Sequence, residues 1–245
     1  MGQLFSNGIN DIYSITAFSL LSRQFDLFFT AYLPEQQKTD FKYMYTVYSG
    51  GDDLFFIGEW QQAIHFTNHI NKAFSQYTGN KNDLSLSSAV YIMQPFHPIR
   101  AAAESAERLL EKAKQAGRKR ISILDIIIKN EEFDDLLESS EFLNNRLRLE
   151  DKQSKIKSSF LHRLLKYRTL AKEFIYNGRI DGLMYIPRLS YDIGRNIIVR
   201  DKNQDIKQGK EDYDYFKSLL NSSKARDMLY IIFPVFCTLM KNRKA

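Results

Sequence analysis

Hydrophobic residues recur every three or four positions in several segments of the chain, the spacing of one face of an α-helix. In the first half this pattern predicts helices over residues 11–33, 60–77 and 99–116. Between them, runs rich in aromatic and β-branched residues predict strands instead. These predicted strands cover residues 43–48, 54–57, 83–93 and 119–128. The expected order is therefore helix, two strands, helix, strand, helix and strand.

From residue 131 onward the pattern is nearly all helical. Predicted helices cover residues 132–149, 155–176, 212–220 and 224–241, with a mixed stretch around 188–199. We therefore expect an α+β protein with a domain boundary near residue 129. Residues 1–128 would form a ferredoxin-like palm that lacks its first strand. Residues 129–245 would form an all-α domain.

The composition allows a large hydrophobic core and is typical of a cytoplasmic protein. The 245 residues are 44% hydrophobic, enough for one large or two small domains. A single cysteine, Cys237, excludes an internal disulfide and suits a reducing compartment. No signal peptide is visible in residues 1–10. The most apolar run, 228–240, contains Pro234 and is shorter than the roughly 20 residues of a membrane span. We expect no membrane partner.

The formal charge of +6 is distributed unevenly. Residues 1–128 carry 12 Lys/Arg and 12 Asp/Glu, whereas residues 129–245 carry 23 and 17. Within the second half, residues 152–179 hold eight basic residues and one acidic residue. Such a density could follow a phosphate backbone, or it could be a solvated helix face. The sequence leaves both interpretations open.

Residues 48–58 contain the strongest candidate for a catalytic site. Gly50 and Gly51 separate two predicted strands. Glycine supplies the positive-φ turn of a tight hairpin and leaves no side chain to block a phosphate. Asp52 and Asp53 follow at the tip, where Mg²⁺ could collect carboxylate and phosphate oxygens together. The alternative is an ordinary polar turn, although paired like charges give such a turn no advantage.

Three other features are weaker candidates for chemistry. Lys114 lies near the end of the 99–116 helix, from which its ammonium could reach a triphosphate, although the segment is also simply a good helix former. His65 and His69 stand four residues apart, a spacing found in zinc sites, but no third ligand is evident. We expect both histidines to lie at the surface or its boundary. Cys237 lies in an apolar helix and is expected to be inert.

The 49–58 block and the 103–114 helix resemble the catalytic palm of the large subunit of type III-A CRISPR–Cas effector complexes. The similarity continues in residues 1–8, 20–29 and 186–196 and so extends over nearly the whole chain. The resemblance implies the second palm, of polymerase and cyclase type, and the C-terminal helical domain of that subunit. It implies a role in antiviral defence, in which ATP is joined into cyclic oligoadenylate once guide RNA pairs with target RNA.

The resemblance also implies roles for individual residues. Asp52 and Asp53 would bind Mg²⁺ or Mn²⁺ and act in catalysis. Ser49, Gly50 and Gly51 would border the ATP, and Lys114 would contact its phosphates. The 3′-hydroxyl of one ATP would attack the α-phosphorus of another, while the metal ions lower the pKa of the hydroxyl and neutralise the transferring group. The implied partners are the other subunits of the effector complex, guide RNA and target RNA.

The chain departs from the family pattern at its start. The family's palm opens with an Asp-x-Asp strand, which is not found before Met1, and the HD nuclease domain and first palm are also absent from these 245 residues. We therefore expect the chain to correspond to the C-terminal part of a longer protein. A truncation, a split gene or a misplaced start would each explain this, and with a split gene a companion chain would carry the remaining domains. Alone, the chain is expected to make no cyclic oligoadenylate and to cut no single-stranded DNA.

Two other hypotheses remain. Diguanylate cyclases share the Gly-Gly hairpin and the helix end at residues 113–118, but their hairpin differs from Asp52-Asp53-Leu54, and the helical C-terminal half is left unexplained. A preference for GTP would favour this hypothesis. The second is a non-catalytic scaffold that docks RNA and neighbouring subunits through the basic helical half. Unchanged signalling after loss of both aspartates would favour the scaffold.

Overall fold

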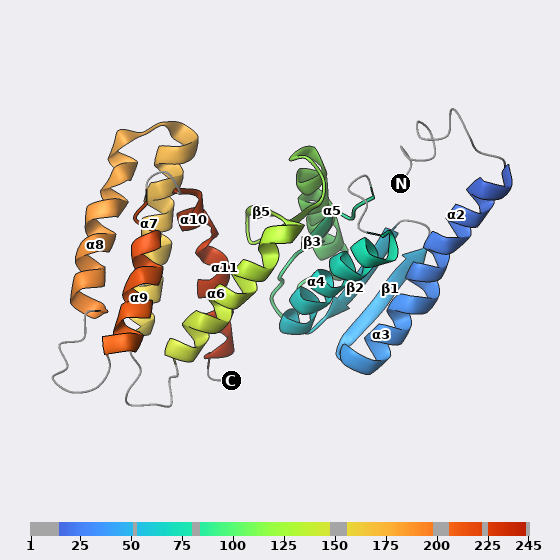
Figure 1. Cartoon of the computed structure of the whole chain (residues 1–245), viewed down its shortest axis with the longest axis horizontal. Helices are drawn as coiled ribbons and strands as arrows, with labels where there is room; N and C mark the ends of the chain where they lie inside the picture. Colours follow the sequence, from blue (N-terminus) through green and yellow to red (C-terminus); the bar gives the residue numbers. More distant parts are fainter. Residues whose placement is uncertain are drawn as a thin grey trace. The chain divides into compact units, whose positions relative to one another are not determined.

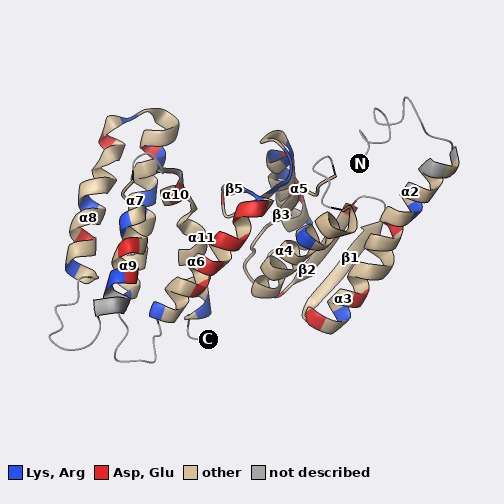
Figure 2. Cartoon of the chain, in the orientation of Figure 1, with Lys and Arg blue, Asp and Glu red and all other residues tan. Residues whose placement is uncertain are grey.

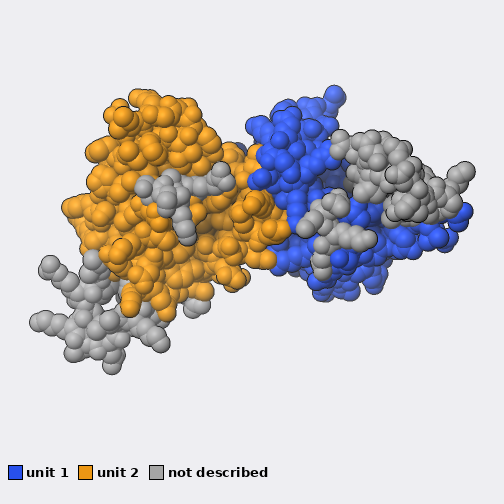
Figure 3. Space-filling model, turned by 45° about the horizontal axis from the view of Figure 1, so that its top comes forward, with its two compact units in different colours: residues 1–122 blue, residues 123–245 orange. Residues whose placement is uncertain are grey.

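The computed structural model describes residues 15–50, 53–79, 84–147, 156–197, 206–221 and 225–243. The chain divides into two compact units, residues 1–122 and 123–245 (Figure 3). Helices predominate, and the described strands form two small sheets, so the predicted α+β class is confirmed. Among the described residues, no helix is both long and apolar enough to cross a membrane.

Unit 1 contains a long helical segment followed by the strands of the candidate site (Figure 1). Its helices are α2 (Ile15–Leu27), η1 (Phe28–Tyr32), α3 (Leu33–Asp40), α4 (Trp60–Tyr77) and α5 (Ile99–Gln115). Its strands are β1 (Met44–Gly50), β2 (Asp53–Gly58), β3 (Ser88–Val90) and β4 (Arg120–Ile123), and the boundary between the units falls inside β4. The helix predicted over residues 60–77 is confirmed at both ends. Glu59 precedes it and accepts hydrogen bonds from the backbone N–H groups of Gln61 and Gln62.

The first helical segment is longer than the pattern predicts, because η1 and α3 carry it to Asp40. The turn η1 is a π-helix, whose wider winding inserts an extra residue into the helical repeat. The adjacent residues Phe28 and Phe29 are both 1% exposed. The Phe28 ring packs edge-on against Phe74 of α4, with ring centroids 5.3 Å apart. These phenylalanines form the centre of the unit 1 core, against which Met44, Leu54 and Phe56 of the hairpin also pack.

The sheets correct two strand predictions. Of residues 83–93, only Ser88–Val90 form a strand. Residues 119–128 form two strands, β4 and β5 (Ile126–Lys129), separated by a turn at Leu124 and Asp125. Both turn residues have positive φ, 47° and 63°, as in the tight hairpin turns that usually contain Asn-Gly. Leu-Asp carries no such signal, which is why the pattern of side chains predicts one strand here.

Among the described residues, the strands do not make the single sheet expected of a ferredoxin-like fold. β1 and β2 pair with each other, and the second sheet has the order β3-β4-β5. The strands β2 and β3 are therefore edge strands of different sheets, with a pocket between them that is described below.

Unit 2 is helical apart from its first strand (Figure 1). Its helices are η2 (Asn130–Glu132), α6 (Phe133–Arg146), α7 (Ser158–Asn177), η3 (Ile180–Met184), α8 (Tyr185–Asn196), α9 (Ile206–Ser218), α10 (Ala225–Tyr230) and α11 (Ile232–Lys241). The stretch predicted as mixed is the regular helix α8. The last predicted helix is divided into α10 and α11, and Pro234 lies in the first turn of α11, where a missing N–H costs nothing. A single apolar core, with Phe160, Leu164 and Tyr185 fully buried, unites these helices.

The basic residues of α7, coloured blue in Figure 2, are mostly paired with acidic residues of unit 2. Arg168 and Lys172 both contact the carboxylate of Asp125, each at 2.5 Å. Arg163 Nε lies 2.6 Å from Asp192 Oδ2. These two acidic partners lie outside the 152–179 segment and compensate two of its seven net positive charges. The helix therefore presents a weaker positive field to a phosphate backbone than the residue count indicates.

Candidate functional site

The candidate site lies at the tip of the β1–β2 hairpin. The two strands are antiparallel, and Gly50 pairs with Asp53, Ser49 with Leu54 and Tyr48 with Phe55. Two residues, 51 and 52, connect the last pair. Asp53 is the first residue of β2 and is exposed to solvent. Asp52 and Gly51, to which the sequence assigns metal binding and nucleotide binding, lie outside the described residues.

The register corrects the role assigned to Gly50. The sequence predicts that Gly50 supplies a positive-φ turn, but it is the last residue of β1 and is absent from the positive-φ glycines of the described chain. The reason is that Gly50 still pairs with Asp53 and so keeps the extended backbone of a strand. A Cβ on Gly50 would lie 3.3 Å from the hydroxyl of Tyr48, so the glycine makes room for this exposed ring beside the tip.

Ser49 anchors the hairpin to the core of unit 1. Its hydroxyl donates a hydrogen bond of 2.7 Å to the backbone carbonyl of Phe29, which is buried in η1. The hydroxyl proton is therefore used inside the protein, and only the oxygen lone pairs of Ser49 remain for a ligand. The sequence suggests that this serine borders a nucleotide. Its observed contact gives it a positioning role that the sequence did not reveal, since the two residues are separated by 20 positions.

Lys114 lies in the last turn of α5. Its Nζ is 2.9 Å from Glu111 Oε1, one turn earlier on the same helix, and both side chains are about half exposed. Among the described contacts, none links Lys114 to the hairpin. An exposed pair of this kind is weak, about 0.3–0.5 kcal/mol, so it would yield readily to a phosphate. The contact with phosphate stays a prediction.

The carboxylate chemistry of the tip suits a hard divalent cation. Mg²⁺ and Mn²⁺ prefer carboxylate, phosphate and water oxygens, and they are often held by one or two carboxylates together with substrate phosphates. Across the part of the chain that the structure describes, no group of three or more His, Cys, Asp or Glu residues could hold a metal by itself. Ligands from a nucleotide or from water would have to complete a site that begins with Asp53.

The histidines and the cysteine take no part in this site. His65 is exposed, whereas the His69 ring packs against Phe41 with centroids 5.5 Å apart. Burial raises the pKa of the Cys237 thiol to about 12. A thiol that stays protonated is a poor nucleophile and metal ligand, as the sequence predicts for this residue.

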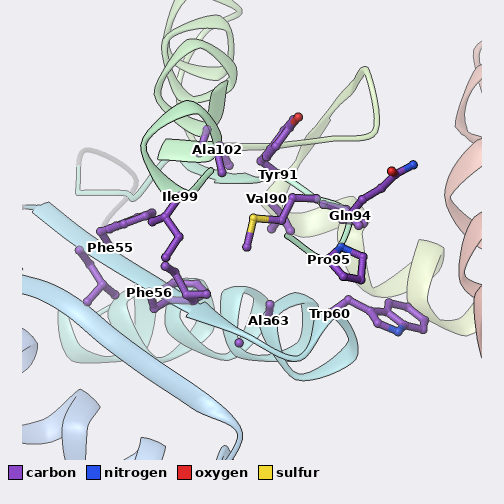
Figure 4. A pocket seen from close by; sticks show the side chains of 17 residues that line it. Phe55, Phe56, Trp60, Ala63, Val90, Tyr91, Gln94, Pro95, Ile99 and Ala102 are labelled. Carbon is purple, nitrogen blue, oxygen red and sulfur yellow. The ribbon is translucent and has the colours of Figure 1, made fainter. Parts of the chain in front are cut away.

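A pocket beside the hairpin was not predicted from the sequence (Figure 4). It has a volume of about 360 Å³ and is lined by β2, by residues 89–95, and by side chains of α4 and α5. Ala63, Ile99 and Ala102 point toward it from the two helices, and Trp60 also lines it (Figure 4). No lining residue carries a charge. No local pattern signals such a pocket, because the whole of α4 separates β2 from β3 in the sequence.

Comparison with known proteins identifies unit 1. A family model for the second palm domain of Cas10/Cmr2 matches residues 1–122. Through this domain, the chain belongs to the Cas10/Cmr2 family. The resemblance to a type III-A large subunit is thereby confirmed, and the matched segment contains the whole Gly-Gly-Asp-Asp hairpin.

Relatives of the Cas10 type extend the similarity into unit 2. The single-strand-specific deoxyribonuclease Cas10/Csm1 (subtype III-A) of Streptococcus thermophilus is 29% identical over 230 residues. The match covers 91% of this chain but 28% of that protein. The corresponding protein of Enterococcus italicus is 32% identical over 124 residues, covering 50% of this chain and 16% of the relative. The chain thus spans less than a third of the length of these relatives.

Solved Cas10-type structures share the fold. Csm1 from T. onnurineus superimposes with a TM-score of 0.73 at 20% identity, covering 100% of this chain and 36% of that one. A Csm1–Csm4 cassette in complex with AMPPNP gives a TM-score of 0.67 at 20% identity and covers 99% and 34% of the two chains. A cassette in complex with cA3 gives 0.67 at 19% identity, with 99% and 34% coverage.

Proposed function

We propose that this chain is the second palm and C-terminal helical domain of a type III-A CRISPR effector. In this proposal the β1–β2 hairpin binds ATP with Mg²⁺ or Mn²⁺, and the complex joins ATP into cyclic oligoadenylate when target RNA pairs with guide RNA. The observation that carries the proposal is the register of the hairpin, in which Gly50 ends β1 and pairs with Asp53, the exposed first residue of β2. The family match of residues 1–122 and the nucleotide complexes of neighbours with this fold support it.

Each residue of the hairpin has its own role in this proposal. Asp52 and Asp53 would hold the cation, which would lower the pKa of the attacking 3′-hydroxyl and neutralise charge on the phosphoryl group. Gly50 and Gly51 let the phosphates approach the backbone closely. Ser49 holds the end of β1 against Phe29, so the carboxylates are positioned before the substrate arrives. Lys114 would exchange its contact with Glu111 for a phosphate oxygen.

The wider assignment follows from the same proposal. Residues 1–128 act as the second palm, of polymerase and cyclase type, and residues 129–245 act as the helical domain. The partners are the other effector subunits, guide RNA and target RNA, in the cytoplasm. The purified chain alone binds nucleotide, makes no cyclic oligoadenylate and cuts no DNA.

The test measures binding of AMPPNP to the purified chain by calorimetry in the presence of Mn²⁺. Asp52→Ala and Asp53→Ala should each weaken binding at least about tenfold, because each removes a charged ligand of the cation. Asp40→Ala is the matched control, since Asp40 is an exposed carboxylate of unit 1 on another element, and should leave affinity unchanged. Equal affinity in all three variants would refute the proposal. Tighter binding of GMPPNP than of AMPPNP would favour a diguanylate-cyclase-like site.

A further inference from the structure

The outer face of α8 carries arginine and tyrosine side chains but no exposed acidic residue. Arg188, Tyr191 and Arg195 follow one another at steps of three and four residues, so they form one stripe along the helix. All three are exposed, Tyr191 to 66%. The acidic residue of α8, Asp192, is 7% exposed and accepts hydrogen bonds from the neighbouring helix α7 instead. The stripe therefore carries positive charge that no carboxylate of its own helix neutralises.

The two arginines of this stripe differ from other arginines of unit 2. Arg146, Arg163 and Arg168 each contact a carboxylate of the same unit, at 2.9, 2.6 and 2.5 Å. Among the described contacts, no carboxylate forms an ion pair with Arg188 or Arg195. Arginine and tyrosine are enriched at protein interfaces, and both are common among the residues that dominate binding. The stripe therefore has the composition of a docking surface whose partner supplies the carboxylates.

The helix α6 of the same chain has the complementary charge, and Figure 2 shows bands of acidic residues along it. Asp134, Glu138 and Glu141 lie at steps of four and three residues, so they share one face. Glu138 and Glu141 are exposed, and among the described contacts neither has a cationic partner. No basic residue of α6 precedes Arg146. This face therefore carries negative charge that its own helix does not compensate.

The two stripes match when the helices run antiparallel. The stripe of α8 steps by three residues and then by four, and the stripe of α6, followed in the reverse direction, does the same. Each stripe spans seven residues, about 10.5 Å along a helix. The antiparallel direction also puts the negative end of the α8 dipole beside the positive end of the α6 dipole. The facing pairs are then Arg188 with Glu141, Tyr191 with Glu138 and Arg195 with Asp134.

Two helices can approach each other closely only where the side chains leave room, and Gly194 provides it on α8. Gly194 lies one turn from Tyr191 on the same side of the helix and is exposed. A Cβ at this position would meet no atom within 4 Å. Glycine weakens a helix interior, and here no side chain of the chain itself uses the space. The face is therefore open to a second helix as well as charged.

We propose that α8 of one copy of this chain docks antiparallel on α6 of a second copy. Arg188 and Arg195 pair with carboxylates of α6, and the Tyr191 hydroxyl donates to the carboxylate of Glu138. Exposed ion pairs are individually weak and are screened by salt, so the association is weak and depends on ionic strength. A nucleic-acid duplex fits less well, because each strand carries a charge about every 3.4 Å whereas the arginines are about 10.5 Å apart. The proposal uses no residue of the hairpin site.

Sedimentation velocity of the purified chain, over a range of concentrations and without nucleotide, tests this contact. We expect reversible association at about 50 mM salt that is at least tenfold weaker at about 500 mM. Arg188→Glu and Glu141→Arg should each weaken self-association at least tenfold, because each places like charges face to face. A mixture of the two variants should associate again, because the two reversed charges then face each other. Circular dichroism of each variant checks that its helices are intact.

Two control variants make the same changes of charge on other elements. Arg243→Glu and Glu107→Arg alter exposed residues outside both stripes and should leave the association unchanged. Three results would overturn the proposal: a monomer at every concentration in low salt, equal losses in stripe and control variants, or a mixture that stays monomeric. Binding of an oligouridylate that Arg188→Glu abolishes, with the chain monomeric throughout, would also overturn it and assign the stripe to RNA. Because nucleotide is absent, failure here is independent of any failure at the hairpin.

Discussion

Replacing Gly182 with alanine would put a methyl group into space already occupied by the backbone of α7. Gly182 lies in the short helix η3, which packs directly on α7 within unit 2. A Cβ at this position would lie 2.5 Å from the carbonyl oxygen of Leu170 and 2.6 Å from the backbone nitrogen of Phe174. Both neighbours are backbone atoms of a helix, so neither can rotate away. The contact can be relieved only by moving η3 and α7 apart.

The magnitude follows from the cost of overpacking. Inserting a methyl group into a filled core typically costs about 1–3 kcal/mol, and a backbone neighbour places this case at about 3 kcal/mol. Gly194 is the matched control, because it is exposed on α8 and a Cβ added there would meet no atom within 4 Å. Alanine there should stabilise by about 0.5–1 kcal/mol through the reduced entropy of the unfolded chain. The two alanine variants should therefore differ by about 3–4 kcal/mol.

Thermal unfolding followed by circular dichroism measures this difference. At about 2–4 °C per kcal/mol for a chain of this size, Gly182→Ala should lower Tm by about 6–12 °C and Gly194→Ala should raise it slightly. Trp60 fluorescence, recorded in the same samples, follows unit 1 and so separates its transition from that of the helical unit. If Gly182→Ala unfolds at the same temperature as the unchanged protein, η3 does not pack on α7 at this distance and the reasoning is wrong.

Three further predictions concern buried polar groups of unit 2. Asp192→Ala should cost about 2–3 kcal/mol by urea unfolding, because it leaves Tyr167 Oη and Arg163 Nε, each 2.6 Å from Asp192 Oδ2, without their partner. Burial, with the hydrogen bond to Asp192, raises the pKa of Tyr167 to about 12, and burial raises that of Tyr215 to about 12. The pKa of an unfolded tyrosine is about 10, so between about pH 10 and 12 the folded state keeps a phenol proton that the unfolded state has lost. The free energy of unfolding should therefore fall over this range by about 1.4 kcal/mol per pH unit for each tyrosine. Tyr167→Phe should reduce that slope, and an unchanged slope would contradict the assignment. Cys237, whose pKa burial raises to about 12, should react with a thiol reagent at pH 8 on the order of a hundredfold more slowly than in urea-unfolded protein, and equal rates would show that the thiol is accessible.

The elements that the sequence predicts correctly are those that depend on neighbouring residues. The helix Trp60–Tyr77 has a strong apolar face and a carboxylate cap at Glu59, so its ends are set by residues that lie next to each other. The hairpin strands β1 and β2 were likewise predicted, since both are short, apolar and joined by glycine. The shortness of β3 was not predictable, because a strand needs a partner and only Ser88–Val90 have one.

In the candidate site, too, the features set by neighbouring residues could be predicted and those set by distant residues could not. Its residue types, two glycines followed by two carboxylates, are evident in the sequence, and Asp53 does stand at the end of a strand. The hydrogen bond from Ser49 to Phe29 links residues 20 positions apart. The pocket is lined by strands that precede and follow α4 in the sequence. No spacing rule connects such residues, because their proximity is a product of the packed core. The partner of Lys114 could be predicted, because Glu111 lies three residues earlier on the same helix and such pairs lie side by side on a helix surface.

The hairpin is held in place through β1. On the β1 side, Ser49 is bonded to η1 and Met44 to α3, and η1 itself is locked by the packing of Phe28 on Phe74. The acidic tip is therefore positioned through β1 and the aromatic core of unit 1.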